Sequence, residues 1–482
     1  MTTSPTLLWF RRDLRLADHR ALLYAIELGQ PIIPVYLHAE DDGGVWRDGA
    51  ASQWWLHHAL EDLASQLESL GSQLTIYSLE SEDQLADFLI QLAEETGAKQ
   101  IVWSRRYEPH FCQRDRQIKS SLTNAGILAK SFNNSLLYEP DEVKNKSGGH
   151  FKVFTPFWKS LKDQPPEKPL PSPVSLASLQ PDYWPAGIAV SELNLLPSIS
   201  WDAGFYKNWL ASHQGAEASL KKSLSKAPNY QQTRDTPAID GTSRLSPYLH
   251  FGQLSPRELW HSLNDRFGND AAIVEGITRQ LYWREFSAHT HYHFPHSTDR
   301  ALKPEYDAFP WNYDEDIIKQ WQKGETGYPI VDAGMRELWA TGWMHNRVRM
   351  ITASLLVKHL LQPWQEGARW FWDTLVDADL ANNSMGWQWV AGCGADASPY
   401  FRIFNPIIQG KKFDPSGDYV RKWIPELAQL PNEYIHEPWT CPPLELISYG
   451  VQLDKDYPNP IIDHQKGRQQ ALDALAEFKS NR

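Results

Sequence analysis

TLLWFRRDLR, residues 6–15, decides the fold of the first part of the chain. The apolar run Thr6–Phe10 has the length and composition of a buried strand, and charged residues follow it at once. Four similar runs are predicted strands, at residues 32–37, 74–79, 100–103 and 127–132. Amphipathic stretches at 54–70 and 82–95 end at Gly71 and Gly97, where helix C-caps belong. This alternation predicts an α/β fold with a doubly wound parallel sheet.

The charged turn Arg11-Arg-Asp-Leu-Arg15 stands where dinucleotide-binding folds carry GxGxxG, so an ordinary dinucleotide site there is not expected. Residues 151–199 are rich in proline and lack periodicity, and we interpret them as a long connector over the surface. From Trp201 helical spacing dominates, and Ser255, Pro256 and Glu258 have the pattern of an N-cap, N1 and N3. We predict three parts: an α/β domain over 1–132, an interdomain linker over 133–200 and an all-α domain over 201–482.

The composition is that of a globular protein, with 482 residues, 41% of them hydrophobic. No apolar run is long enough to span a bilayer, and the first residues lack the pattern of a signal peptide, so we expect a cytoplasmic protein. Cys112, Cys393 and Cys441 have no metal-ligand spacing and are interpreted as packing residues. The net charge of −12 argues against DNA binding unless one face is locally basic. The 22 tryptophans suit packing, stacking on bases or a cofactor, or electron transfer.

Three stretches carry groups suited to chemistry. Residues 241–246, GTSRLS, put hydroxyls and an arginine before a helix-like run, which suits either a phosphate or a simple N-cap. Asp377 and Asp379 stand among aromatic residues; a metal site is the least favoured interpretation, because no histidine or third acid lies beside them. Residues 343–350, WMHNRVRM, place two arginines in an apolar helical context, in which His345 and Arg349 share a face.

A basic and aromatic stretch follows the last of these. It interleaves Arg402, Lys411, Lys412, Arg421 and Lys422 with Tyr400, Phe401, Phe404, Phe413 and Tyr419. This mixture is typical of a nucleic-acid-binding face, although a solvated charge run is an equal alternative.

Long motifs in a fixed order make the chain resemble the DNA photolyases and cryptochromes. They are WFRRDLRLADHRAL at 9–22, GTSRLSPYLHFG from 241, WREF from 283, GYPIVDAGMRELWATGWMHNRVRM at 327–350, DADLANNSMGWQW at 377–389 and FRIFNPIIQGKKFDP at 401–415. The resemblance covers nearly the whole chain. It implies an N-terminal antenna domain, a linker and a C-terminal helical domain that holds FAD.

The resemblance also assigns site residues. Flavin-binding positions match Tyr230, Thr242, Ser243, Arg244, Leu245, Ser246, Asp377, Ala378 and Asp379, and Asn383 matches the residue beside flavin N5. An electron relay to photoexcited flavin matches Trp387, Trp364 and Trp311, and Trp389 is assigned to a side branch or to the lesion. Lesion contacts match Gln280, Trp283, Asn346, Arg347, Met350 and Trp389, and DNA contacts match Arg234 and Gln409.

Two of these positions bear on substrate. Asn346 and Met350 stand where (6-4) photolyases carry histidines, which favours cyclobutane pyrimidine dimers. Gln280 departs from the glutamate of well-known cyclobutane-dimer photolyases; an amide still bonds a thymine edge but donates no carboxyl proton. Together with Phe309-Pro-Trp-Asn312, the motifs are most similar to bacterial class III enzymes.

The expected activity is that of a deoxyribodipyrimidine photo-lyase, a carbon–carbon lyase of DNA repair. Photoexcited reduced FAD passes an electron to a dimer flipped out of the stack, a step known for photolyases in general. The resemblance favours 5,10-methenyltetrahydrofolate as antenna and leaves a deazaflavin or FMN open. We expect a monomer without an obligatory protein partner. The alternatives are a cryptochrome-type blue-light photoreceptor and a flavoprotein without repair activity; Asn383 and the absence of a long tail favour repair.

Overall fold

The computed structural model describes residues 4–481 and opens with a five-stranded parallel sheet. The strands are β1 (Thr6–Phe10), β2 (Ile32–Ala39), β3 (Thr75–Leu79), β4 (Gln100–Ser104) and β5 (Leu128–Phe132), in the order β3-β2-β1-β4-β5. Strand β1 is central and buried throughout, with Leu8 in register with Pro34 and Val102. The predicted strands are therefore confirmed, with ends that differ by one or two residues.

Helices cover both faces of this sheet: α1 (Arg20–Glu27), α2 (Ala50–Ser69), α3 (Leu85–Thr96) and α4 (Pro109–Asn124). Leu7 and Trp9 of β1 pack with α3 and α4, whereas Leu8 and Phe10 pack with α1 and α2 on the other face. This alternation is the period-2 geometry of a strand buried on both sides. It confirms the doubly wound fold. Gly97 caps α3 with φ +72°, as the sequence predicts.

The stretch predicted as a featureless connector contains a helix, α5 (Phe154–Leu161). Phe154, Phe157, Trp158 and Leu161 are all buried and follow the i, i+3, i+4, i+7 spacing of one helix face. Pro156 lies in the first turn, where proline is tolerated. The interpretation of residues 151–199 as irregular was therefore wrong for this segment, since the density of prolines masked its periodicity.

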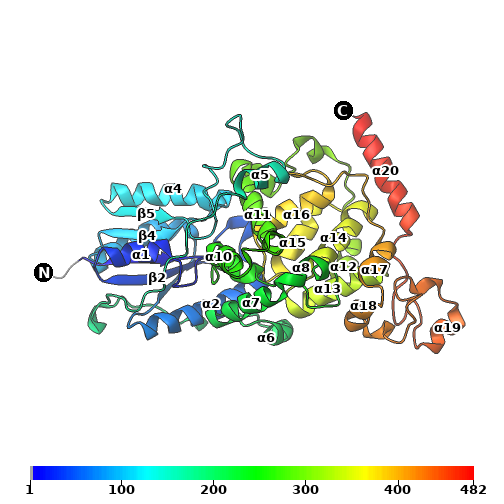
Figure 1. The fold of residues 1–482 in the computed structure, drawn as a ribbon, viewed down its shortest axis with the longest axis horizontal. Coiled ribbons are helices and arrows are strands. Elements are labelled where there is room, and N and C mark those ends of the chain that lie inside the picture. The colour runs from blue at the N-terminus through cyan, green and yellow to red at the C-terminus, as the bar shows by residue number, and fades with distance from the viewer. Residues whose placement is uncertain (1–3, 482) are drawn as a thin grey trace.

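The rest of the described chain is helical, and no strand follows β5 up to residue 481. Figure 1 shows these helices gathered beside the sheet domain, with the C-terminal helix at the far end. They are α6 (Phe205–Asn208), α7 (His213–Lys226), α8 (Tyr230–Thr233), α9 (Ser246–His250), α10 (Pro256–Phe267), α11 (Ala271–His293), α12 (Glu315–Lys323), α13 (Pro329–Thr341), α14 (Asn346–Ser354), α15 (Trp364–Thr374), α16 (Leu380–Ala391), α17 (Pro406–Phe413), α18 (Asp418–Trp423), α19 (Pro443–Ser448) and α20 (His464–Ser480). A π-helical turn, Leu355–His359, continues α14.

Side-chain caps form where the sequence indicates them. Ser255 caps α10 and Glu258 bonds back to the Ser255 N–H at 3.0 Å, which completes the predicted capping box. The sequence predicts that His345 lies within the helix that carries Arg349. The structure places it just before α14, as the N-cap, where its side chain accepts from the Arg347 N–H at 3.1 Å. Its position at the helix end supports the interpretation of His345 as a structural residue.

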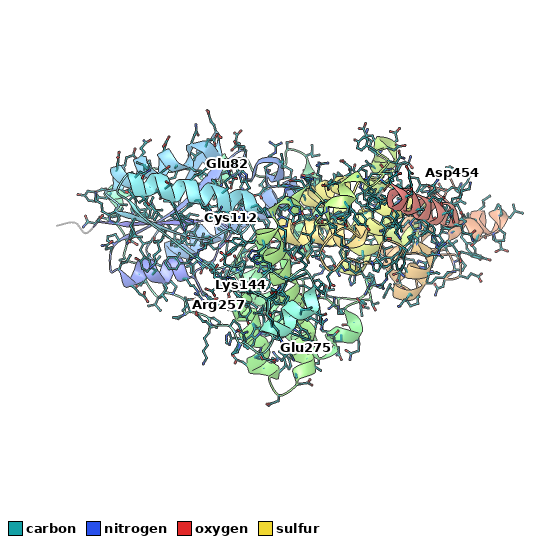
Figure 2. The ribbon with its side chains drawn as sticks, turned by 90° about the horizontal axis from the view of Figure 1, so that it is seen from above. Glu82, Cys112, Lys144, Arg257, Glu275 and Asp454 are labelled. Carbon is teal, nitrogen blue, oxygen red and sulfur yellow. The ribbon has the colours of Figure 1, made fainter. Side chains whose placement is uncertain are left out.

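The charged turn after β1 joins the two domains. Arg15 is buried and donates to the carbonyls of Gly252 at 2.7 Å and Asn134 at 2.7 Å. Buried Asp18 binds Arg257 of α10 at 2.6 Å; Arg257 is labelled in Figure 2 near the junction. Gly252 has φ +71°, and a Cβ there would lie 2.2 Å from the carbonyl oxygen of Arg12. The turn is thus used for domain contact, which explains why it carries no dinucleotide motif.

Among the described residues, no helix has both the length and the apolar character needed to cross a bilayer.

Candidate functional site

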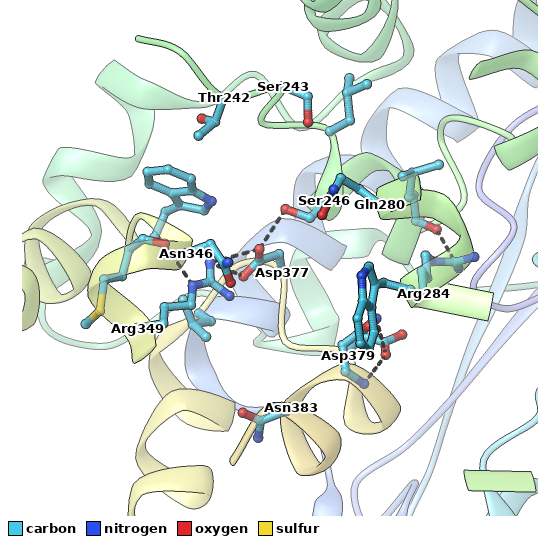
Figure 3. A pocket seen from close by; sticks show the side chains of 18 of the residues that line it. Thr242, Ser243, Ser246, Gln280, Arg284, Asn346, Arg349, Asp377, Asp379 and Asn383 are labelled. Atoms are coloured by element: carbon cyan, nitrogen blue, oxygen red, sulfur yellow. Dashed lines mark hydrogen bonds and ion pairs between the residues drawn. The ribbon is translucent and has the colours of Figure 1, made fainter. Parts of the chain in front are cut away.

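One cavity of about 530 Å³ opens in the helical domain, within the size range of small-molecule sites. Figure 3 shows that its walls come from segments far apart in the sequence. The structure gathers there most of the predicted site residues: Tyr230, Arg234, Thr242, Ser243, Arg244, Leu245, Ser246, Gln280, Trp283, Asn346, Met350, Asp377, Ala378, Asp379, Asn383, Trp387 and Trp389. Arg347, Gln409, Trp311 and Trp364 lie outside the lining.

A turn that alternates left- and right-handed residues lines part of the cavity. Arg244 has a left-handed φ of +53°, and Leu245 follows at φ −91°, ψ −8°. Alternating left- and right-handed residues point their N–H groups into one concavity, which suits an anion such as a diphosphate. The helix α9 that follows has only five residues, so the turn and the Arg244 guanidinium, not a helix terminus, supply the positive potential. That guanidinium lies 4.5 Å from the centroid of Trp343.

Asp377 is held by an arginine that sequence reasoning did not assign. The Nη2 of Arg349 lies 3.0 Å from each carboxylate oxygen of Asp377, and the Ser246 hydroxyl donates to the same carboxylate at 2.6 Å. Arg349 also donates to the carbonyl of Met344 at 2.8 Å. The feature of the sequence that could have indicated this role is the position of Arg349 among apolar residues in a helical stretch. With these donors in place, Asp377 serves as an anchor across the cavity.

Asp379 caps α16 and is a second fixed charge. It accepts from the backbone and side-chain nitrogens of Asn382, at 2.9 and 2.8 Å, and faces His250 at 3.4 Å. Burial acts to raise the pKa of Asp379, but the hydrogen bond and charge of His250, with the charge of Arg284, hold it well below its ordinary value. The Nε2 of His250 is buried without a protein partner among the described residues, so it is available to a ligand.

Asn383 has its amide orientation set by the neighbouring helix. Its Nδ2 donates to the carbonyl of Ala368 on α15 at 2.9 Å, which leaves its carbonyl oxygen to accept from a ligand. A neutral amide that accepts a hydrogen bond suits an N–H group of a bound ring.

The opposite part of the cavity is amphipathic. Asn346 and Met350 are four residues apart on α14 and line the cavity together. Gln280 and Trp283 are three apart on α11 and contribute an amide and an indole. This combination of hydrogen-bonding edges and flat apolar surface suits a pyrimidine base.

The three tryptophans of the predicted relay differ in their relation to the cavity, and their order as a relay stays a prediction. Trp387 lines the cavity and is 3% exposed, Trp364 is 2% exposed, and Trp311 is half-buried. The Trp387 ring lies on Gly367, one turn after Trp364 on α15, where a Cβ would meet it at 2.0 Å. The indole in ring contact with Trp387 is Trp321, at 6.0 Å between centroids, which the sequence did not single out. Trp389 lines the cavity instead.

The predicted basic and aromatic face is only partly a surface. Arg421 donates to the carbonyls of Ala428 at 3.2 Å and Leu430 at 2.6 Å, and Tyr419 is buried with its hydroxyl on Glu337 at 2.7 Å. Tyr419 is therefore not available to a nucleic-acid face, and the Arg421 guanidinium is engaged within the protein. They instead tie α18 to its surroundings.

Arg347 and Gln409, two predicted DNA or lesion contacts, lie outside the cavity lining on α14 and α17. Arg347 reaches Asp235 at 3.0 Å and lies 4.5 Å over the ring of Phe413 on α17. Gln409 stands four residues before Phe413 on the same helix, and exposed Lys411 pairs with Glu437. The helices that carry Arg347 and Gln409 are thus adjacent.

A family model described as the FAD binding domain of DNA photolyase matches residues 277–477, and one described as DNA photolyase matches residues 6–174. The chain is 46% identical to a deoxyribodipyrimidine photo-lyase of Agrobacterium fabrum over 99% of both proteins. It is 38% identical to cryptochrome-1 of Arabidopsis thaliana, over 98% of this chain and 70% of that protein.

Solved structures show the same relation. A bacterial class III photolyase from Agrobacterium tumefaciens superposes with a TM-score of 0.94 at 45% identity, covering 100% of this chain and 98% of that one. An archaeal photolyase from Sulfolobus tokodaii with two FAD molecules gives a TM-score of 0.80 at 28% identity, over 98% of this chain and 100% of that one.

Proposed function

The chain belongs to the DNA photolyase and cryptochrome family, and on that premise we propose that it repairs cyclobutane pyrimidine dimers in DNA under blue light. The observation that carries the proposal is a single cavity with two unlike parts. One part has an anion-binding turn and two fixed carboxylates, and the other has amides and flat apolar side chains. A cofactor and a flipped-out dimer would therefore meet in one cavity.

The residues present fit FAD. The turn at Arg244 and Leu245 is suited to its diphosphate, and the oriented amide of Asn383 is suited to the edge of its ring. When bound, reduced FAD would supply light-driven electron transfer to the lesion and back. The protein holds the two groups in contact, excludes water and provides fixed dipoles around the dimer.

Lesion choice follows from the amphipathic part of the cavity. We propose that Asn346 and Gln280 bond to pyrimidine edges while Met350 and Trp283 cover the apolar surface of the dimer. Met350 has no proton to give, and Gln280 offers an amide in place of an acid. Such side chains suit a dimer that splits by electron transfer alone, and neither Asn346 nor Met350 supplies an imidazole at the two positions where (6-4) photolyases carry histidines.

DNA binding is proposed to use the mouth of this cavity. Arg234 lines it, and Arg347 and Gln409 lie just outside on α14 and α17. Local basic groups at the mouth are enough to hold the phosphates that flank the lesion, despite the net charge of −12.

An antenna chromophore is proposed on the resemblance to class III photolyases, with 5,10-methenyltetrahydrofolate favoured. In doubly wound sheets a ligand ordinarily binds at the carboxyl ends of the strands. Here that edge holds a cavity of only about 50 Å³, lined by the ion pairs Arg12–Asp48 and Arg114–Asp42. A planar chromophore at this edge would have to displace those pairs, which argues for a site elsewhere. Chromophore release followed by absorbance spectroscopy distinguishes a folate from a deazaflavin or FMN.

The deciding experiment uses purified protein with chemically reduced flavin and two oligonucleotides, one with a thymine cyclobutane dimer and one with a (6-4) product. We expect blue light to restore the first and leave the second unchanged. A protein that binds neither lesion more tightly than undamaged DNA would instead support a photoreceptor, the function named for its cryptochrome relative.

A further inference from the structure

The linker helix α5 touches the lesion side of the cavity through one ring stack. Phe154 lies face to face with Trp283, with 3.7 Å between ring centroids and 6° between planes. Trp283 lines the cavity, whereas Phe154 is 1% exposed and does not. One face of the indole is therefore covered by Phe154, and the plane in which Trp283 meets a ligand is set by the ring behind it.

The stack is held from two sides. The Phe286 ring stands roughly perpendicular to both stacked rings, at 5.9 Å from Phe154 and 5.9 Å from Trp283. The guanidinium of Arg279 lies 5.3 Å over Phe154 and 4.6 Å over Trp158. Because edge-to-face and offset contacts are the favoured aromatic geometries, these neighbours restrict rotation of the stacked pair.

The start of α5 is also tied to the other wall of the cavity. Asp396, in the segment after α16, donates its N–H to the carbonyl of Lys152 at 3.1 Å. Burial raises the pKa of Asp396, and the N–H of Phe154 is near enough to its carboxylate to act to lower that pKa. Two residues later, Ser398 donates to the carbonyl of Trp389, another cavity residue, at 3.2 Å. Asp396 adopts a left-handed φ of +46°, which a segment keeps only where its surroundings hold it.

Figure 1 shows α5 beside α11, the helix that carries Trp283, and Figure 2 marks Lys144 of the linker close to that helix. The linker therefore does more than connect two domains. Its helix α5 supports the indole of Trp283 in the cavity, and its backbone is hydrogen-bonded to the segment that follows α16.

We propose that Phe154 is a positioning residue for lesion recognition, which acts by fixing the plane of Trp283 against the dimer. The proposal rests on the proposed repair function. Loss of the stack lets Trp283 tilt, so affinity for the dimer falls, while contacts to phosphates and to FAD are unchanged. An aromatic stack is worth enough to predict a loss of dimer affinity of about three- to tenfold.

The test compares Phe154→Leu with Phe157→Leu in the full-length protein loaded with FAD. Phe157 is equally buried on the same helix and packs on Phe151, Phe286 and His289, with no ring contact to Trp283. Dissociation constants are measured at one salt concentration for a dimer-containing and an undamaged oligonucleotide. We expect Phe154→Leu to weaken only dimer binding, and Phe157→Leu to leave both constants unchanged.

Two further variants keep the proposal open to refutation. In a Trp283→Ala background, Phe154→Leu should add nothing, because a double-mutant cycle isolates an effect that passes through Trp283. If Phe154→Leu fails to retain FAD, Asp396→Gly takes its place as the test. It removes the carboxylate, glycine accepts the positive φ, and the variant should show the same loss of affinity for dimer DNA alone. Unchanged dimer affinity in a flavin-loaded Phe154→Leu or Asp396→Gly protein overturns the proposal. A wild-type protein that does not prefer dimer DNA overturns the repair function instead.

Discussion

Replacing Trp387 by phenylalanine separates two processes that the proposed function assigns to the same cofactor. Trp387 lines the cavity, lies on Gly367 of α15, and packs against Phe371 with 5.0 Å between centroids. Phenylalanine keeps a flat apolar ring but is much harder to oxidise. We therefore expect Trp387→Phe to abolish photoreduction of oxidised flavin, while a sample reduced chemically beforehand still repairs dimers.

The structural cost of this change should be small. Trp387 is 3% exposed, so the variant loses buried atoms and leaves a small void. Truncation of a buried tryptophan to alanine costs roughly 3–5 kcal/mol, and keeping a six-membered ring should reduce that to about 1 kcal/mol. A fall in thermal stability much larger than this would mean that the loss of photoreduction reports on damage to the fold.

The assay follows flavin absorbance under blue light with a thiol present, and then repair by the pre-reduced protein. Gly367→Ala is a complementary variant, since its Cβ would lie 2.0 Å from the Trp387 ring and must displace an indole that is still oxidisable. Normal photoreduction in Trp387→Phe would refute the assigned relay and point to another donor near the flavin. Failure of the pre-reduced variant to repair would show that Trp387 acts in the catalytic cycle itself.

Three further outcomes follow from the site and its surroundings. Asp377→Asn leaves the Arg349 guanidinium without its carboxylate. FAD retention on gel filtration should therefore fall, and the free energy of unfolding should drop by about 2 kcal/mol. Unchanged FAD retention would show that this pair is not part of the cofactor site. Burial raises the pKa of Glu285 to about 7. The folded protein therefore keeps a proton that the unfolded chain releases, so the free energy of unfolding falls as the pH rises from about 5 to about 8. In chemical denaturation, Glu285→Gln should remove about 2 kcal/mol of that fall. Arg347→Ala should weaken DNA binding and lower the dependence of log affinity on log salt concentration by about one. Arg421→Ala should lower thermal stability and leave that slope unchanged. Equal slopes in the two variants would contradict the assignment of Arg347 to the DNA-binding mouth of the cavity.

Much of the fold was predictable because it depends on local patterns. The period-2 and continuous apolar runs predicted all five strands, and the glycine at 97 predicted where α3 ends. The helix α5 was missed because prolines dominate the composition of its surroundings, although Phe154 and Leu161 stand at the ends of a regular apolar spacing. The position of His345 was missed by one residue, which is within the ordinary uncertainty of helix ends.

Chemical type and order along the chain determined which residues belong to the candidate site, through motifs long enough to identify a family. Tertiary structure alone decided their partners. Arg349 contacts Asp377, 28 residues later in the chain, and Phe154 contacts Trp283, more than a hundred residues later. No repeating pattern in the sequence predicts either contact. The same holds for Arg421, whose charge suggested DNA but whose guanidinium is bonded to backbone carbonyls. Local structure follows from the spacing of neighbouring residues, whereas the role of a charge or a ring depends on what the folded chain places against it.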